Sequence, residues 1–202
     1  MIPRNDINGV VLAGGRSRRM QSDARANIDK GLLELEGLPL VQRAAQFLVP
    51  RVSKVFISAN RHFDIYRRYG QCVADDARFG GDAGPLAGVA SVMAVSASPW
   101  LLVLPVDVLR VPEDMATRLM HAVAQGAPLA YACAAGRAHP LCMLVSGELS
   151  GDLNAYLQQG GRKVLDWHQR HGAVAVDFGG DVALFSNINT PEDWAAADGG
   201  VA

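Results

Sequence analysis

Short apolar runs alternate along residues 9–126 with longer segments in which apolar positions recur at helical spacing. The runs at 10–12, 55–58, 72–74 and 100–104 predict buried strands, because parallel strands covered on both faces are apolar throughout. Between them, segments 39–48, 85–93 and 112–125 have the spacing of helices, and a proline stands near the start of each. This alternation predicts an α/β fold with a doubly wound, mostly parallel sheet.

The pattern changes after residue 126. Two apolar runs, 129–133 and 141–145, flank a segment at 136–140 that we interpret as a loop joining two strands, one of them antiparallel. Residues 153–171 have helical spacing interrupted at Gly160 and Gly161, and 173–177 predict another strand. Because there is no internal repeat, low-complexity tract or linker, residues 1–202 are predicted to form a single domain.

Composition and charge exclude several classes of function. The 19 basic and 20 acidic side chains leave a net charge of −1, which argues against a nucleic-acid coat or a polybasic membrane surface. The three cysteines are widely spaced, as expected for reduced thiols rather than for a disulfide framework or a zinc site. The N-terminus lacks the apolar core of a signal peptide, and no apolar run approaches the roughly 20 residues of a membrane helix. We therefore expect a cytoplasmic protein that binds neither membrane nor nucleic acid.

The first strand ends in Gly14 and Gly15, and cations follow in the polar segment 16–29 and at Lys30. Backbone N–H groups of a glycine turn can approach an anion closely, so the combination indicates a phosphate site with a loop over it. The turn matches neither the dinucleotide fingerprint nor the P-loop. An ordinary turn followed by a solvated basic loop remains the alternative.

Three carboxylates follow two of the predicted strands, 72–74 and 100–104, where an open α/β sheet binds its ligands. They are Asp75, Asp76 and Asp107. Mg²⁺ takes one or two carboxylates and completes its shell with water and phosphate, so Asp107, after the most apolar strand, is the leading metal ligand. The alternative is that Asp107 caps a turn. His139 precedes a proline and is interpreted as a structural or surface residue, and no Ser/His/Asp or Cys/His arrangement has a recognisable signature.

Several motifs, taken in order, resemble one family over essentially the whole chain. They are Leu12-Ala13-Gly14-Gly15, Arg19-Met20, Asp29-Lys30-Gly31, Ala59-Asn60-Arg61-His62, Gly84-Pro85-Leu86-Ala87-Gly88, His139-Pro140 and the segment 187–193 (Asn-Ile-Asn-Thr-Pro-Glu-Asp). The first three resemble nucleotidyltransferases that activate a phosphorylated partner with an NTP. The remainder resemble molybdenum cofactor guanylyltransferases, which implies a Rossmann-like nucleotidyltransferase fold.

The resemblance implies a reaction in which GMP is transferred from GTP to molybdopterin, with Mg²⁺ as cofactor and pyrophosphate as product. It implies a set of GTP-binding residues: Leu12, Ala13, Gly14, Gly15, Lys30, Ser58, Asp75 and Asp107. Lys30, Asp107 and Arg19 would act in catalysis, and Asp107 would hold the metal ion. Gly15, Asn187 and Asn189 would face the pterin substrate, and molybdoenzymes or other proteins of cofactor biosynthesis would be partners.

The chain departs from the family pattern at three places. Residues 24–28 resemble an insertion, Ser58 stands where the family often has Asn, and only the acid remains of a Cys-Asp-x-Pro motif around Asp107. The alternatives are a cytidylyltransferase for the same cofactor, a sugar-phosphate nucleotidyltransferase, and a GTP-binding adaptor without catalytic activity that delivers the cofactor.

Overall fold

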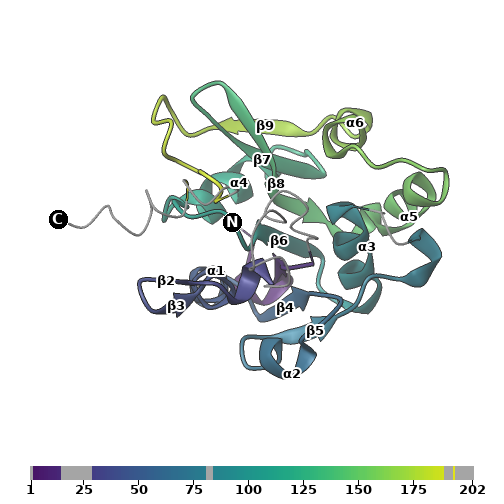
Figure 1. Ribbon diagram of the computed structural model, residues 1–202. Coiled ribbons are helices and arrows are strands. Elements are labelled where there is room, and N and C mark those ends of the chain that lie inside the picture. Colours follow the sequence, from purple (N-terminus) through teal and green to yellow (C-terminus); the bar gives the residue numbers. More distant parts are fainter. Residues whose placement is uncertain (1, 15–28, 81–83, 189–192, 194–202) are drawn as a thin grey trace.

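The computed structural model describes residues 2–14, 29–80, 84–188 and 193. Within them, seven strands form one sheet in the order β5-β4-β1-β6-β8-β7-β9 (Figure 1). The strands are β1 (Ile7–Leu12), β4 (Lys54–Ser58), β5 (Gln71–Val73), β6 (Trp100–Pro105), β7 (Leu129–Ala134), β8 (Arg137–Ser146) and β9 (Val174–Asp177). All neighbours pair in parallel except β8, which is antiparallel to both β6 and β7. The predicted mostly parallel sheet with an antiparallel member is confirmed.

Helices cover both faces of the sheet. Val11 and its equivalents on neighbouring strands pack against α1 (Leu40–Leu48) and α4 (Met115–Val123). Val10 faces the other way, toward α3 (Pro85–Val95), α5 (Ser150–Gln158) and α6 (Val164–Arg170). Figure 1 shows these two layers on opposite sides of the strands. Adjacent residues of one strand thus fill two cores, which explains why the strand sequences are apolar without alternation.

Two 3₁₀ turns, a short hairpin and a short helix complete the part of the fold that bears on the site. A 3₁₀ turn, η3 (Lys30–Leu32), precedes a short antiparallel hairpin of β2 (Glu34–Leu35) and β3 (Leu38–Pro39). A short helix, α2 (Phe63–Tyr66), joins β4 to β5, and a second 3₁₀ turn, η4 (Ala77–Phe79), follows β5. None of the helices in the described segments is long and apolar enough to cross a membrane.

The segment 136–140 was expected to be a loop, but all of it except Gly136 belongs to β8. The turn between β7 and β8 is made by Ala135 and Gly136 alone, both at positive φ (48° and 72°), as a two-residue hairpin requires. In the sequence Pro140 favours a loop, because proline cannot donate a ladder hydrogen bond and is uncommon within a strand. The register shifts between Tyr131 and Ala132, opposite the stretch that contains Pro140, so the proline lies where the pairing is interrupted.

Candidate functional site

The candidate site lies where β4, β1 and β6 end together. Leu12, the last residue of β1, is level with Ser58 on one side and Pro105 on the other. The ladder continues beyond the strands, because Ala13 N donates to Ser58 O (2.9 Å) and Val106 N to Leu12 O (3.1 Å). In the sheet, β1 lies between β4 and β6, and the chain continues from β1 to β4 on one side before it crosses to β6 on the other. This edge is therefore the switch point at which open α/β sheets bind ligands.

The glycine turn at the end of β1 has room on its open side. A Cβ added to Gly14 would come no closer than 3.5 Å to any neighbour, the Asn60 side-chain amide, which is ordinary contact. Packing among the described residues therefore does not require glycine there. Close approach of a ligand to the backbone is the remaining reason for it, in keeping with the predicted phosphate site.

Lys30 and Asp107 meet at the end of β6. Lys30 Nζ donates to Asp107 Oδ2 at 2.9 Å, and the two side chains are 15% and 22% exposed. Lys30 lies in η3 and Asp107 lies in the turn after β6, 77 residues further along the chain. The structure thus brings together the cation and the carboxylate that the motifs single out.

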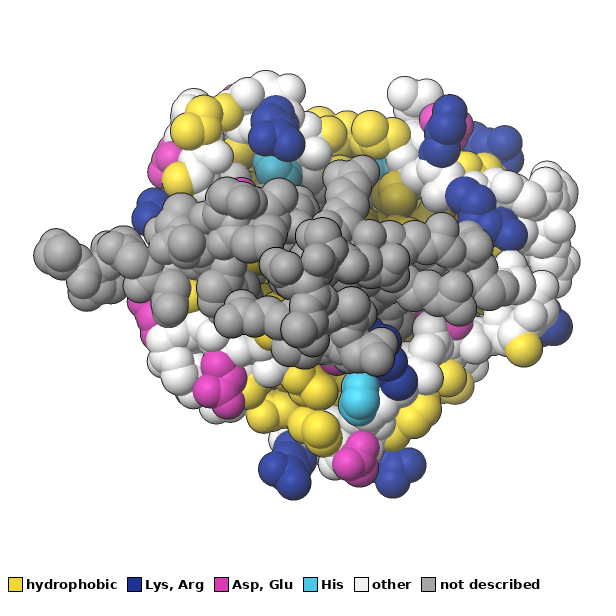
Figure 2. Space-filling model, in the orientation of Figure 1, with side chains coloured by type: hydrophobic (Ala, Val, Ile, Leu, Met, Phe, Trp, Pro, Cys, Tyr) yellow, Lys and Arg dark blue, Asp and Glu magenta, His cyan; other side chains and the backbone are white. Residues whose placement is uncertain are grey.

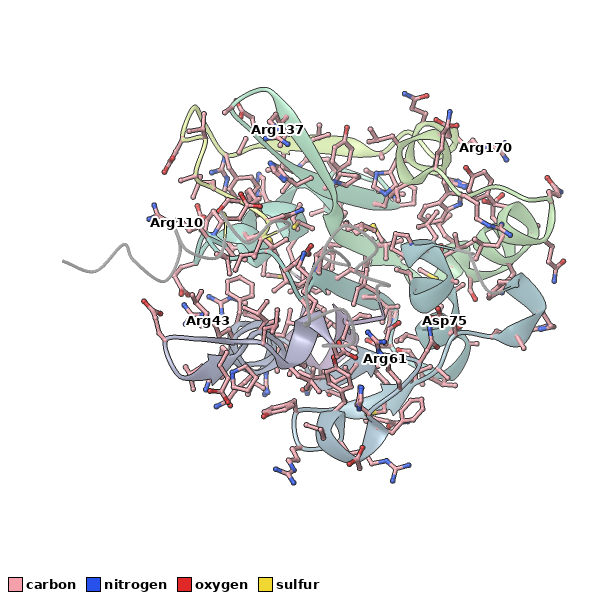
Figure 3. All side chains as sticks on the ribbon, in the orientation of Figure 1. Arg43, Arg61, Asp75, Arg110, Arg137 and Arg170 are labelled. Carbon is pink, nitrogen blue, oxygen red and sulfur yellow. The ribbon has the colours of Figure 1, made fainter. Side chains whose placement is uncertain are left out.

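The second carboxylate, Asp75, follows β5 and is held by Asn60. The Asn60 side chain donates to Asp75 Oδ2 (2.8 Å) and accepts from Asp75 N (2.8 Å). Ser58 is buried, and its hydroxyl lies 3.5 Å from Asp75 Oδ1. The position of Asp75 on the ribbon is labelled in Figure 3. The orientation of Asp75 therefore depends on Asn60, which stands in one of the motifs but was given no separate role.

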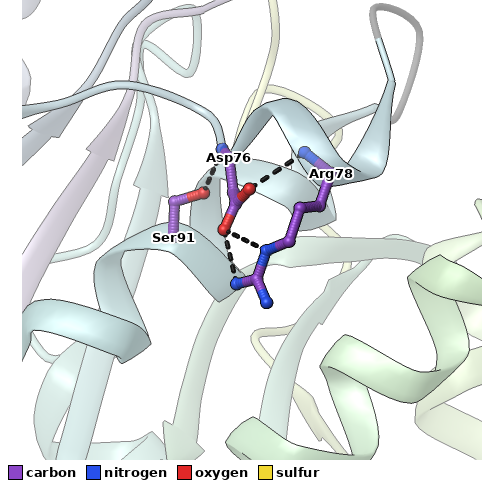
Figure 4. A network of polar contacts seen from close by, with 3 residues as sticks. All are labelled: Asp76, Arg78 and Ser91. Carbon is purple, nitrogen blue, oxygen red and sulfur yellow. Dashed lines mark hydrogen bonds and ion pairs between the residues drawn. The ribbon is translucent and has the colours of Figure 1, made fainter.

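The neighbouring Asp76 has a structural function, in contrast to Asp75. Its carboxylate accepts from the Arg78 backbone (2.9 Å) and from the Arg78 guanidinium (2.6 and 2.9 Å), and its own N–H donates to Ser91 Oγ (2.8 Å; Figure 4). The hydrogen bonds from Arg78 lower the pKa of Asp76. This residue caps η4 and joins it to α3, so of the two adjacent acids only Asp75 is turned to the site.

A third acid, Asp29, immediately precedes Lys30 and is 3% exposed. It accepts hydrogen bonds from Gly31 N (3.2 Å), Tyr66 Oη (2.7 Å) and Arg61 Nε (2.9 Å). Asp29 and Arg61 belong to the sequence motifs but had no predicted role, and Tyr66 was not among the predicted site residues. No local signal could reveal this cluster, because Asp29 caps η3, Arg61 lies just before α2 and Tyr66 is the last residue of α2.

The opposite side of the site is formed by the segment that returns to β6 near the C-terminus. Asn187 pairs with Val108 in an isolated antiparallel bridge, and Ile188 N donates to Asp107 O at 3.1 Å. The backbone of this segment therefore lies beside that of Asp107, and the role of Asn187 toward the pterin substrate stays a prediction. Gly15, Arg19 and Asn189, together with nearly all of the predicted loop at 16–29, lie outside the described residues, and their roles stay predictions.

Two further titratable residues, His139 and Cys142, are partly or fully buried near this side. His139 stacks on Phe185 with ring centroids 5.1 Å apart, and burial, together with Arg137, lowers the pKa of His139. Burial, reinforced by the negative charge of Asp107, raises the pKa of the Cys142 thiol, so that this cysteine stays protonated. The part of the chain that the structure describes offers no activated nucleophile at this edge, which suits a direct transfer.

The donor set of the site fits a hard divalent cation bound together with a substrate. The described segments contain no group of three or more His, Cys, Asp or Glu residues that could enclose a metal ion. Asp107 supplies one carboxylate oxygen at the open edge of the sheet, and Mg²⁺-like ions commonly take one or two carboxylates plus phosphate and water. Such an ion would compete with Lys30 for the carboxylate.

On the face drawn in Figure 2, the Lys and Arg side chains of the described residues lie scattered around the rim among acidic and apolar ones. They form no continuous basic stripe there, in keeping with the net charge of −1.

Comparison with known proteins agrees with this geometry. Residues 9–173 match the family model described as the MobA-like NTP transferase domain. The molybdenum cofactor guanylyltransferase of Ralstonia nicotianae is 42% identical over 200 residues, which cover 94% of this chain and 95% of that protein. The molybdenum cofactor guanylyltransferase of Shewanella loihica is 36% identical over 187 residues, which cover 92% of each chain.

Solved structures share the fold. Molybdopterin-guanine dinucleotide biosynthesis protein A from Archaeoglobus fulgidus superposes with a TM-score of 0.73 at 20% identity, covering 95% of this chain and 97% of that one. Rv0371C from Mycobacterium tuberculosis, solved in complex with manganese, gives a TM-score of 0.68 at 18% identity over 96% and 99% of the two chains. With the family model and the sequence relatives in agreement, this chain belongs to the molybdenum cofactor guanylyltransferases, nucleotidyltransferases built on a MobA-like NTP transferase domain.

Proposed function

We propose that this protein transfers GMP from GTP to molybdopterin and releases pyrophosphate. The observation that supports the proposal most directly is the meeting of Lys30 and Asp107 beside the glycine turn, at the switch point of the sheet. A cation, a carboxylate and backbone N–H groups at one edge are what binding of a triphosphate with a divalent ion requires. The names of the sequence relatives point to the same reaction.

The nucleotide would lie across the ends of β1 and β4. Leu12, Ala13, Gly14 and Gly15 would line it with backbone groups. Asp75, oriented by Asn60, offers carboxylate oxygens to hydroxyl or amino groups of the nucleoside. Ser58 would contribute to the same side through its contact with Asp75, and Asn187 with Asn189 would face the pterin substrate.

The transfer itself needs no covalent enzyme intermediate. A phosphate oxygen of molybdopterin attacks the α-phosphorus of GTP, and the bond from that phosphorus to the bridging oxygen of pyrophosphate breaks. Lys30, with Arg19 as a further predicted cation, would hold the triphosphate in line and offset the charge that develops on the leaving group. A Mg²⁺ ion on Asp107 would supply Lewis-acid neutralisation of the phosphate oxygens.

The experiment is a turnover assay of the purified protein with molybdopterin and, in parallel, GTP, ATP or CTP, in which pyrophosphate and the dinucleotide product are both quantified. We expect turnover with GTP above that with ATP and CTP. Since Ser58 replaces an amide that could donate and accept together, we expect weaker rejection of ATP than in relatives that carry Asn. Lys30→Ala should weaken GTP binding and slow the transfer with little effect on the melting temperature. Lys163→Ala, at a lysine 82% exposed, is the matched control and should leave binding and transfer unchanged.

Each alternative has its own result in this assay. Preference for CTP would replace the guanylyltransferase by a cytidylyltransferase, and turnover with a sugar phosphate instead of molybdopterin would indicate the sugar-phosphate branch. Tight GTP binding without any product would indicate an adaptor. Cytoplasmic location, and molybdoenzymes as recipients of the product, stay predictions that this assay does not address.

A further inference from the structure

Asp29 is an acidic side chain buried next to the site, and the proposed reaction gives it no role. A carboxylate that is 3% exposed must be compensated, since burial of an unpaired charge is costly. Its two oxygens are occupied by neighbours: Oδ1 accepts from Gly31 N and Tyr66 Oη, and Oδ2 from Arg61 Nε. With its hydrogen-bonding capacity directed into the protein, Asp29 is placed to hold structure rather than to contact a substrate.

The structure that Asp29 holds is the turn that carries Lys30. Asp29 is the N-cap of η3, and Tyr66, which is fully buried, comes from the far end of α2. Burial, reinforced by the hydrogen bond to Asp29, raises the pKa of Tyr66, so the phenol remains a donor. A Cβ on Gly31 would lie 2.5 Å from Tyr66 Oη, so the turn sits directly against this ring. The hydrogen bond from Tyr66 to Asp29 and the packing of Gly31 against the Tyr66 ring thus fix η3 to α2.

We propose that Asp29, held by Arg61 and Tyr66, is a positioning residue that fixes η3 so that the Lys30 ammonium reaches the Asp107 carboxylate at the end of β6. The consequence for phosphate binding rests on the proposed function, whereas the positioning of Lys30 does not. Lys30 has a long, flexible stem, and a cation on such a stem acts on a reacting phosphate only if its backbone is placed accurately.

The first test is the chemical reactivity of Lys30, which requires no substrate. The chain contains three lysines, Lys30, Lys54 and Lys163, so an amine-reactive reagent followed by peptide mass spectrometry reports each one separately. Lys30 is 15% exposed and paired with Asp107, whereas Lys54 and Lys163 are exposed and serve as internal references. We expect Asp29→Asn to raise the labelling rate of Lys30 several-fold relative to both references.

Asp152→Asn is the matched control, because Asp152 likewise accepts two side-chain hydrogen bonds, from Trp167 (2.9 Å) and His171 (2.7 Å), at the α5–α6 contact. This variant should lower the melting temperature without changing the labelling of Lys30. If Asp29→Asn does not fold, Tyr66→Phe removes one donor to Asp29 while filling the same space, and a smaller rise in labelling is expected. Unchanged Lys30 labelling in a folded Asp29→Asn or Tyr66→Phe variant would overturn the proposal.

The second test is a double-mutant cycle on kcat/KM and on GTP affinity with Lys30→Ala. If Asp29 acts through Lys30, Asp29→Asn should lower kcat/KM about 100-fold in the native background, a cost typical of a misplaced group, and change it little once Lys30 is absent. Equal losses in both backgrounds would show a general structural role and refute the positioning. Inactivity of the unaltered protein would instead count against the proposed function and leave the labelling result intact.

Discussion

At the scale of single residues, the site depends on a small number of charges rather than on an enclosed metal cage. Asp107 is the carboxylate that the end of β6 presents to Lys30, and the described residues hold no cluster of three or more metal-binding groups. A cation bound there must therefore take most of its ligands from substrate phosphates and water. Its affinity should depend on the nucleotide that is present.

The corresponding prediction concerns Asp107→Asn, which keeps the shape and removes the charge. We expect turnover at saturating divalent cation to fall by at least about 100-fold, because charge stabilisation in the transition state is lost. The fold should be preserved, since the asparagine side chain has the same shape and its oxygen can still accept the hydrogen bond from Lys30. The measurement is initial rate against cation concentration, alongside thermal unfolding.

Asp114→Asn is a suitable control for this substitution, because Asp114 forms a surface pair with Arg118 on α4 and its side chain is 58% exposed. It should leave both rate and cation dependence as they are. Near-normal turnover of Asp107→Asn, with an unaltered response to the cation, would remove Asp107 from the metal site.

At the scale of elements, the approach of α3 to β4 shapes the nucleotide side of the site. The two elements touch at Gly88 and Ser58: a Cβ on Gly88 would lie 2.2 Å from Ser58 Oγ and 3.2 Å from Leu12 Cδ2. Gly88 is therefore the position at which α3 needs a residue without a side chain. The Ser58 hydroxyl in turn lies 3.5 Å from Asp75 Oδ1, so the position of the helix affects a predicted nucleotide ligand.

Gly88→Ala should therefore destabilise the protein despite the better helix propensity of alanine. We expect a loss of about 1–3 kcal/mol in the free energy of unfolding, as overpacking of a tight contact costs, together with weaker GTP binding. Gly151→Ala in α5 is the control, because nothing lies within 4 Å of its added Cβ and the substitution should be neutral or stabilising. Urea unfolding and calorimetric GTP titration measure both effects, and equal stability of the two variants would contradict the steric argument.

The elements that the sequence predicted correctly are those whose pattern is local. The strands at 55–58 and 100–104 appear as β4 and β6, and the helix expected after Pro39 is α1. Apolar runs suffice for these because both faces of the sheet are covered. The prediction for segment 136–140 was wrong because Pro140 and Gly136 resemble a loop, whereas the register across β7 determines where β8 begins.

The candidate site likewise contains residues whose position follows from a local sequence pattern and residues whose position depends on packing between elements. Because ligands of open α/β sheets bind where parallel strands end, the sequence alone predicts that Gly14, Asp75 and Asp107 share one edge. This rule could not separate Asp75 from Asp76, because the difference arises from side-chain partners, Asn60 in one case and Arg78 in the other. The contact of Asp29 with Arg61 and Tyr66 could not be predicted from the sequence either, since it depends on how α2 packs against η3.

At the scale of the whole molecule, stability rests on the two apolar layers that sandwich the sheet, and one of them contains a titratable group. His168 on α6 is 1% exposed and lies among aromatic rings, with Tyr131 of β7 at 5.0 Å and Trp167 at 5.9 Å between centroids. Neither ring nitrogen has a hydrogen-bond partner among the described residues. An uncharged imidazole is compatible with this layer, whereas an imidazolium is not.

From the burial of His168 we predict how the free energy of unfolding depends on pH. Burial, with a smaller contribution from His171, lowers the pKa of His168 from 6.5 to about 4, so between these values the unfolded chain binds a proton that the folded chain does not. Stability should therefore fall as the pH drops through this window, by about 3 kcal/mol in all. His168→Phe keeps a ring against Tyr131 and should remove this part of the slope, whereas His121→Gln, at an exposed histidine of α4, should follow the unaltered protein. Urea unfolding from about pH 7.5 to about pH 4.5 measures all three, and parallel curves for His168→Phe and the unaltered protein would show that the buried imidazole does not govern acid stability.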